Sequence, residues 1–302
     1  MTQSPILVTG AAGDVGAVGR TLTRLLREKG HKVRALVRRE DDRAGALRRL
    51  GAEVVQGDLT DLASTHRAMD GVKRVYFGMS ISPSYLEATV NIAAVAKHHG
   101  VEAFVNMSQM TVSQMSITET TQSPQHKLHW LAEQALTWSG LPVVEMRPTV
   151  FLEGFFLRLA AQGVKQNDEL MLPLGKAKTS PISSTDVAAA IAAILDRPAP
   201  HIGRIYNLTG YESADLDQHA AAFSKALGRK ISYRDLPVSA WTEKLRELGI
   251  PAHLLGHLAT MAELHAAGRY DRMTDDFTRL TGKTPIGVHD FVKANAAAFT
   301  RS

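Results

Sequence analysis

Three glycines near the N-terminus have the residue type and spacing of a phosphate-binding turn. Gly10, Gly13 and Gly16 follow a short apolar run, residues 6–8, and precede a helix-like segment. Gly10 suits a tight turn with positive φ, Gly13 lets a pyrophosphate approach the backbone, and Gly16 lets the helix pack closely on the strand. The N–H groups at the helix N-terminus would then face the phosphates. This spacing predicts dinucleotide binding. A glycine-rich turn in another α/β domain is the alternative.

Two arginines follow the second apolar run, residues 33–37. An acidic residue at this point would hydrogen-bond the ribose 2′-hydroxyl of NAD, whereas an arginine suits the 2′-phosphate of NADP. Arg38, and less strongly Arg39, therefore favours NADP(H) over NAD(H). The alternative is that both are solvated charges ahead of an arginine-rich helix.

Composition excludes several classes of protein. The chain has 302 residues, a net charge of +5 and no cysteine, so disulfides, thiolate nucleophiles and cysteine-bound metals are excluded. The N-terminus lacks the hydrophobic region of a signal peptide, and no apolar stretch is long enough to cross a membrane. We therefore expect a cytoplasmic protein with no membrane partner. The mild positive charge favours anionic small molecules, but there is no basic tail or basic–aromatic pattern that would indicate nucleic-acid binding.

Strand-like and helix-like segments alternate through the first half of the chain. This alternation predicts an α/β protein with a Rossmann-type, doubly wound parallel sheet. Residues 1–150 would form the NAD(P)-binding domain. Residues 151–302 would form a smaller, mostly helical lobe for the substrate, interleaved with the first domain. In such sheets the ligand lies at the carboxyl ends of the strands. The expected strands are 6–8, 33–37, 52–58, 72–79, 101–108, 143–148 and 203–208.

A set of short motifs, found together, resembles the NmrA-like family of atypical short-chain dehydrogenase/reductases. The resemblance spans nearly the whole chain, and the combination is specific although each motif is common. The family includes NAD(P)H-dependent quinone reductases, and also proteins that bind the dinucleotide without turnover and act as regulators. The matching motifs are residues 9–16, 34–38, 57–59, 139–142, 147–148, 206–210, 278–285 and 290–292.

The resemblance implies a cofactor site, residue by residue. Arg38 would contact the 2′-phosphate, and Asp58 with Leu59 would flank the adenine. The phosphate loop would be formed by Gly10, Gly13, Asp14, Val15 and Gly16. The ribose and nicotinamide would pass Gly78, Met79 and Ser80, with Met107 on the neighbouring strand.

The glycine loop departs from the usual pattern of the family. It is about three residues longer than is usual, so Gly13, Gly16 and Gly19 form an alternative register. The exact phosphate contacts therefore stay open, although the location of the site does not.

A second departure concerns the catalytic pair of classical short-chain dehydrogenases. Those enzymes place a Tyr one helical turn before a Lys, so that both lie on one helix face. With Glu133 aligned to the glutamate that often follows the pair, Gln125 takes the Tyr position and His129 the Lys position. Carbonyl–alcohol chemistry then lacks its usual proton donor. We expect His129 to hold the ribose hydroxyls in place of the lysine.

Further candidates lie around this helix. His126 is a candidate proton donor in the substrate pocket, with the alternative that both histidines lie on a polar surface. Ser108 ends a strand where a catalytic serine would lie, and with Gln109 it would orient a substrate carbonyl. We also assign Thr149 and Phe151 to the substrate pocket.

Methionines near the strand ends, Met79 and Met107 among them, would suit a flat aromatic ligand, with core filling as the alternative. No metal ligands are predicted here, because His126 and His129 lack a third ligand at suitable spacing. His98 and His99 are assigned no function, since imidazoles at a helix C-terminus complement its dipole.

Two functions fit these residues. The first is an NADPH-dependent oxidoreductase that passes hydride to a quinone-like or other unsaturated small molecule, which needs little help from a side-chain acid. The second is a non-catalytic NADP(H)-binding sensor that acts through a protein partner. Fold alone does not choose between them.

Overall fold

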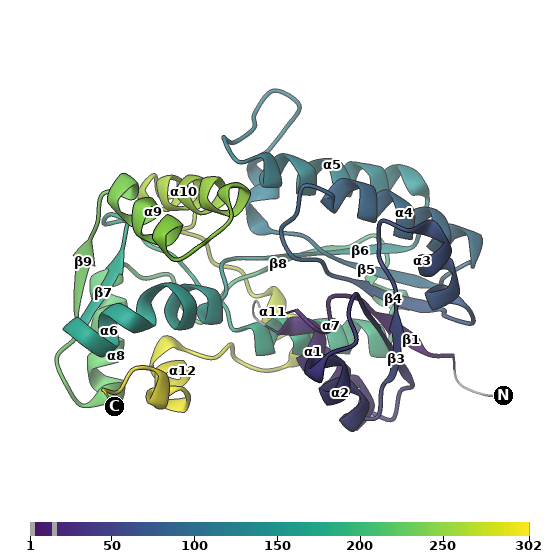
Figure 1. Ribbon diagram of the computed structural model, residues 1–302, viewed down its shortest axis with the longest axis horizontal. Helices are drawn as coiled ribbons and strands as arrows, with labels where there is room; N and C mark the ends of the chain where they lie inside the picture. The colour runs from purple at the N-terminus through teal and green to yellow at the C-terminus, as the bar shows by residue number, and fades with distance from the viewer. Residues whose placement is uncertain (1–3, 14–16, 302) are drawn as a thin grey trace.

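The computed structural model describes residues 4–13 and 17–301, and its main feature is a seven-stranded parallel sheet (Figure 1). The strand order is β3-β2-β1-β4-β5-β6-β8, which confirms the predicted doubly wound α/β class. Short, nearly continuous apolar segments form these strands because both faces of the sheet are covered by helices. The strands are β1 (Ile6–Val8), β2 (Val33–Val37), β3 (Glu53–Gln56), β4 (Arg74–Phe77), β5 (Ala103–Met107), β6 (Val143–Pro148) and β8 (Ile205–Leu208).

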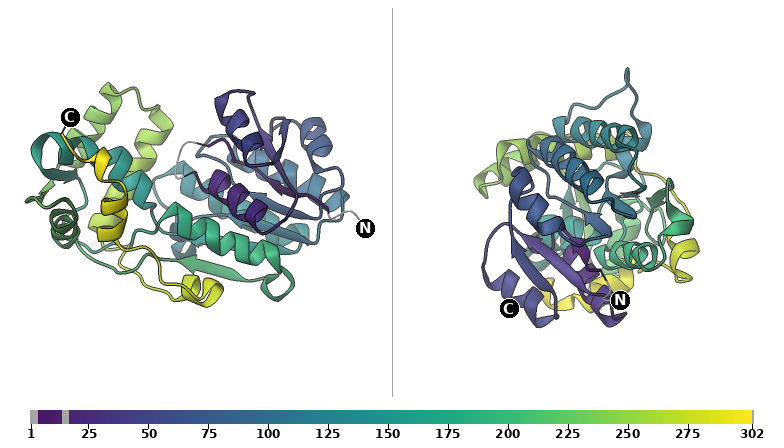
Figure 2. Two further views of the ribbon diagram at one scale, coloured as in Figure 1. Left: turned by 90° about the horizontal axis from the view of Figure 1, so that it is seen from below. Right: turned by 90° about the vertical axis from the view of Figure 1, so that its right-hand side faces the viewer.

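Helices pack on both faces of this sheet (Figure 2). Two of these helices have an aspartate as N-cap. The side chain of Asp41 accepts from the backbone N–H of Arg43 in α2, and that of Asp61 accepts from those of Ala63 and Ser64 in α3. One face carries α1 (Val18–Glu28), α2 (Asp42–Arg49), α7 (Ser184–Asp196) and α11 (Asp276–Thr281). The other face carries α3 (Leu62–Met69), α4 (Tyr85–His98) and α5 (Pro124–Ser139).

A second hydrophobic core lies in a smaller, mostly helical lobe. Phe155 and Phe156 are buried in it, so these two rings fill a core. Short 3-10 helices occur at 110–114, 199–201 and 296–298. The lobe contains a π-helix (Glu153–Ala160), α6 (Ala161–Asn167), β7 (Glu169–Leu172), α8 (Leu216–Leu227), β9 (Ser232–Asp235), α9 (Val238–Glu247), α10 (Ala252–Ala266) and α12 (Val288–Ala294).

The chain returns to the main sheet after residue 150. Helices α7 and α11 pack on the sheet face that also carries α1. Strand β8 pairs with β6 and forms the edge of the sheet. The division into domains at residue 150 stays a prediction. None of the described helices combines the length and the apolar content that crossing a lipid bilayer requires.

Close packing of α1 on the glycine loop depends on Gly19. A Cβ at this position would lie 2.8 Å from the Cα of Ala11 and 2.9 Å from the carbonyl oxygen of Gly10. The sequence assigned this close approach to Gly16, which lies outside the described residues. In the structure Gly19 meets the requirement, three residues after Gly16 and in the first turn of α1.

We expect Gly19→Ala to lower the free energy of unfolding by about 1–3 kcal/mol, because the added methyl group overlaps backbone atoms that cannot move independently. Gly256 in α10 is the matched control, since an added Cβ there meets nothing within 4 Å. Gly256→Ala should be neutral or stabilising by up to about 1 kcal/mol. Urea unfolding gives the free energy of unfolding of both variants and of the wild type. Equal changes from the wild type in the two variants would contradict a close-packing role for Gly19.

Candidate cofactor and reaction site

The strand order reverses between β1 and β4, and the loops that follow these two strands are joined there. The hydroxyl of Thr9 donates to the carbonyl oxygen of Gly78 and accepts from its backbone N–H, each at 2.9 Å. A Cβ on Gly10 would lie 2.5 Å from that same carbonyl oxygen. Open α/β sheets bind their ligands at such a reversal, so this contact marks the centre of the candidate site.

The glycine loop has the backbone that the sequence predicts at its first turn. Gly10 has a φ of +63°, which glycine adopts without strain, and the N–H of Gly13 donates to the carbonyl oxygen of Gly10 at 3.1 Å. The guanidinium of Arg43 donates to the carbonyl oxygen of Ala12 at 3.1 Å and also contacts Asp41. Arg43 therefore ties α2 to the loop. The predicted loop residues Asp14, Val15 and Gly16 lie outside the described residues.

Residues predicted to contact the adenosine end lie at the carboxyl ends of β2 and β3. Arg38 follows β2 directly and its side chain is exposed. Among the described residues, no carboxylate hydrogen-bonds its guanidinium. The carboxylate of Asp58 accepts from the N–H of Thr60 at 2.9 Å and from its hydroxyl at 2.8 Å. These bonds, with the charge of Arg38, lower the pKa of Asp58. Leu59 is half-buried beside it.

These residues fit a dinucleotide. Among the described residues, a Cβ added to Gly13 would lie within 4 Å only of the carbonyl oxygen of Gly10, at 3.1 Å. The exposed guanidinium of Arg38 lies at the strand end where a ribose 2′-substituent is expected. Met79 is half-buried and Ser80 exposed beyond β4, and Met107 ends β5 half-buried. The predicted cofactor residues that the structure describes thus share one edge of the sheet.

The first turns of α5 hold the two residues that the sequence aligns with the classical Tyr and Lys, Gln125 and His129. Both are buried: Gln125 is 2% exposed and His129 7%. His129 Nδ1 lies 2.8 Å from the carbonyl oxygen of Gln125, and its ring stacks on Tyr85 with centroids 4.0 Å apart. Burial lowers the pKa of His129 to about 4, against the opposing effect of that hydrogen bond. The imidazole is therefore neutral at physiological pH and supplies no ammonium-like charge.

His126 does not have the environment that the sequence predicts. Its side chain is fully buried, with Nδ1 2.7 Å from the hydroxyl of Thr121 and the ring packed edge-on against His257 of α10. Burial lowers the pKa of His126 to about 3. The assignment of His126 as a proton donor in the substrate pocket stays a prediction. The alternative, a surface histidine, is wrong for this residue because its side chain is fully buried. It instead packs α5 against the smaller lobe.

Ser108 belongs to a buried charged cluster that connects α5 to β5 and β6. Its hydroxyl donates to Glu133 at 2.5 Å. Arg147 makes a two-pronged ion pair with the same carboxylate, through Nε at 2.9 Å and through Nη2. The serine hydroxyl is thus already engaged, and any role in orienting a substrate would require it to leave Glu133.

A second carboxyl group is buried beside this ion pair. Glu145 accepts from the amide of Asn106 at 2.7 Å, and among the described residues its other oxygen has no hydrogen-bond partner. Burial raises the pKa of Glu145 to about 8, and the charge of Glu133 adds to this effect. Glu145 is therefore largely protonated at neutral pH.

Sequence reasoning missed this layer of buried polar residues. Tyr85 lies on α4, Glu133 on α5 and Glu145 on β6, and these elements are far apart in the chain. The available signal was the alternation in β6, where Glu145 and Arg147 interrupt an apolar strand and point to the same face. Charged residues in a strand that is covered on both faces require partners, which directs attention to α5.

The remaining pocket candidates have structural contacts. Thr149 is buried and its hydroxyl donates to the carbonyl oxygen of Ser180 at 2.7 Å. Phe151 is half-buried and pairs as an isolated bridge with Ile182. Gln109 is half-buried just before the 3-10 helix at 110–114. Their assignment to a substrate pocket stays a prediction.

Fold and site together define a Rossmann-type protein of the NAD(P)-binding class. The model of the NmrA-like family matches residues 2–290. The chain therefore belongs to the NmrA-like family, as the sequence motifs predicted.

Two relatives with full-length similarity are named as reductases. The chain is 29% identical to an NAD(P)H azoreductase of Xenophilus azovorans over 97% of its own length and 99% of the relative. It is 30% identical to the (4-alkanoyl-5-oxo-2,5-dihydrofuran-3-yl)methyl phosphate reductase of Streptomyces griseus, again over 97% and 99%. The chain is thereby classed with the NAD(P)H-dependent oxidoreductases of this family.

A solved structure has the same fold. The NADPH-dependent quinone oxidoreductase QOR2 of Escherichia coli, complexed with NADPH, superposes with a TM-score of 0.83. The identity is 24%, and the match covers 96% of this chain and 99% of that one.

We expect Arg147→Met to lower the free energy of unfolding by about 3–5 kcal/mol, because it leaves Glu133 as an uncompensated buried charge. The control is Arg24→Met, which breaks an exposed pair with Glu28 and should cost under about 1 kcal/mol. Denaturant unfolding at neutral pH compares them. If Arg147→Met lowered the free energy of unfolding as little as Arg24→Met does, the buried ion pair would not contribute to stability as proposed.

The pKa of Glu145 predicts a pH-dependent effect of Glu145→Gln. A carboxyl group whose pKa is raised on folding, here from 4.5 to about 8, contributes stability that is present below its unfolded pKa and is lost as the pH rises through the folded value. The glutamine amide does not titrate, so the variant does not lose stability in this way as the pH rises. Glu145→Gln should therefore gain stability relative to the wild type between about pH 5 and about pH 8. Unfolding at several pH values tests this, with the exposed Glu102→Gln as control. A stability difference from the wild type that stays constant over this range would exclude a raised pKa.

Proposed function

We propose that the protein is an NADPH-dependent reductase that passes hydride to a quinone-like or similarly conjugated small molecule. The observation that carries this proposal is the first two turns of α5. The sequence alignment assigns Gln125 and His129 to the positions of the classical Tyr and Lys, and both side chains are buried, with His129 neutral. Neither side chain supplies an acidic phenol or an ammonium group, so the acceptor must be one that needs no side-chain acid.

A conjugated acceptor meets this requirement. When bound, the reduced nicotinamide supplies a hydride, which together with one proton from water converts a quinone to its hydroquinone. The negative charge that forms on such an acceptor is delocalised, so proton transfer from a positioned acid is less important than for a ketone. The chain then contributes proximity and orientation.

Rigid contacts behind the site would provide that orientation. The Thr9–Gly78 contact holds the loops after β1 and β4 together. The Tyr85 hydroxyl donates to the carbonyl oxygen of Met107 at 3.1 Å, while its ring supports His129. Met79 and Met107 border this edge with adaptable, polarisable side chains that suit a flat ring.

Preference for NADPH over NADH rests on Arg38. Its guanidinium is exposed at the end of β2, and a 2′-phosphate would offer it charge-assisted hydrogen bonds. Two reductase relatives at 29% and 30% identity support the reaction class. The quinone oxidoreductase of similar fold supports the architecture that this proposal requires.

We expect Arg38→Ala to weaken NADPH binding by about 1–3 kcal/mol, the size of lost charge-assisted contacts, and to leave NADH binding nearly unchanged. Isothermal titration calorimetry with both cofactors measures this. Arg67→Ala, which removes an equal charge from exposed α3 surface, is the control. Equal weakening of NADPH and NADH, or equal effects of the two variants, would contradict a role in 2′-phosphate recognition.

Turnover decides between the two functions. NADPH oxidation is followed with a panel of quinones and azo dyes, using wild type and Arg38→Ala. Reduction of at least one acceptor, at a lower rate in Arg38→Ala under subsaturating NADPH, supports the reductase. Tight NADPH binding without reduction of any acceptor would favour a non-catalytic NADP(H)-binding regulator.

A further inference from the structure

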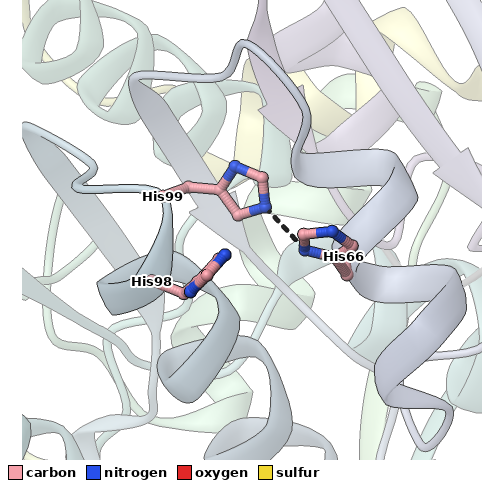
Figure 3. A group of neighbouring side chains, drawn as sticks. All are labelled: His66, His98 and His99. Carbon is pink, nitrogen blue, oxygen red and sulfur yellow. Dashed lines mark hydrogen bonds between the residues drawn. The ribbon is translucent and has the colours of Figure 1, made fainter.

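Three histidines converge on the surface at the C-terminal ends of two neighbouring helices (Figure 3). His66 lies in the last turn of α3, His98 is the last residue of α4, and His99 caps that helix. One nitrogen from each ring lies within 4.8 Å of the other two. His66 and His98 are exposed and His99 is half-buried, so solvent reaches the group.

The rings present their nitrogens to one another. His99 Nε2 and His66 Nδ1 are 2.9 Å apart. The centroid of His66 lies 5.4 Å from that of His98 and 4.8 Å from that of His99. Nitrogens bound to one tetrahedral zinc ion are about 3.4 Å apart, from a Zn–N distance of about 2.0–2.1 Å. Small rotations of exposed side chains therefore suffice to bring all three to a common ion.

Helix ends alone explain only part of this arrangement. Imidazoles near a helix C-terminus interact favourably with its dipole, which accounts for the presence of each histidine separately. It does not account for the convergence of nitrogens from two helices. Charges nearby are of both signs: Lys73 donates to the carbonyl oxygen of His99 at 3.4 Å, and the carboxylate of Asp70 also influences that ring.

We propose that His66, His98 and His99 form a binding site for a divalent transition metal ion, Zn²⁺ being the best fit. Three imidazoles with a fourth position open to water form a ligand set that zinc accepts. The related ions Ni²⁺ and Cu²⁺ also favour imidazole. The bound ion would connect the end of α3 to the end of α4.

This site is separate from the candidate reaction site. Helix α4 begins at Tyr85, which faces the reaction site, and its 14 residues extend about 20 Å to His98. The histidines therefore lie toward the amino-terminal edge of the sheet, away from the glycine loop. Zinc should stabilise this part of the fold without changing NADPH affinity, so the proposal stands or falls independently of the proposed reductase activity.

Calorimetric titration of the untagged chain with ZnCl₂ tests the site. We expect one Zn²⁺ per chain, with an affinity that falls at least about tenfold in His66→Ala and in His99→Ala. His253→Ala is the matched control, because His253 is an exposed histidine on α10, and it should bind zinc like the wild type. His66→Gln retains a hydrogen-bonding side chain next to His99 but removes the ligand, and it should also lose affinity.

Two further readouts separate metal binding from a folding defect. Zinc should raise the melting temperature of the wild type and of His253→Ala but not that of His66→Ala or His66→Gln. Co²⁺ should give the visible absorption of tetrahedral nitrogen coordination in the wild type only when all three histidines are present. Unchanged zinc affinity in both His66 variants, or loss in the His99 variant alone, would overturn the proposal, because the ion would then not bridge the two helices.

Discussion

The buried ion pair between Arg147 and Glu133 constrains the rest of the reaction site. Glu133 is buried and Arg147 is largely buried, and a buried charge without a partner is very costly. Since Arg147 comes from β6, Glu133 from α5 and the attached Ser108 from the end of β5, the pair fixes how α5 sits on the sheet. The positions of His129 and Gln125, about one and two turns earlier on α5, follow from it.

The opposite side of the site depends on close backbone contact rather than on charge. Gly10 packs against the carbonyl oxygen of Gly78 while Thr9 hydrogen-bonds the same residue. Gly19 then lets α1 approach Ala11 closely. The predicted dinucleotide side of the site, around Gly10 and Gly19, is therefore shaped by glycines that allow close backbone contact. The side formed by α5 and β6 is held by an ion pair of opposite charges. The proposed hydride transfer requires mainly that these two sides of the site hold the cofactor and the acceptor in a fixed orientation.

Histidine illustrates how environment decides what one residue type can do. His126 and His129 are buried, and burial lowers their pKa values to about 3 and about 4. They pack and hydrogen-bond as neutral rings. His66, His98 and His99 remain accessible at the ends of two helices. Only in the second group do several nitrogens converge where an ion can reach them.

The sequence by itself determined the fold class and the family, and it predicted the location of the dinucleotide site. Each depends on local patterns: apolar runs that alternate with helices, glycines at a turn, and Arg38 directly after a strand. Tertiary structure alone decided which glycine packs against the loop, that His126 meets His257, and that His66 joins His98 and His99. It also brought Glu133 to Arg147 and left Glu145 protonated. These outcomes depend on contacts between residues far apart in the chain. A local pattern such as the charged alternation in β6 shows that a partner is needed, but it does not specify which residue supplies it.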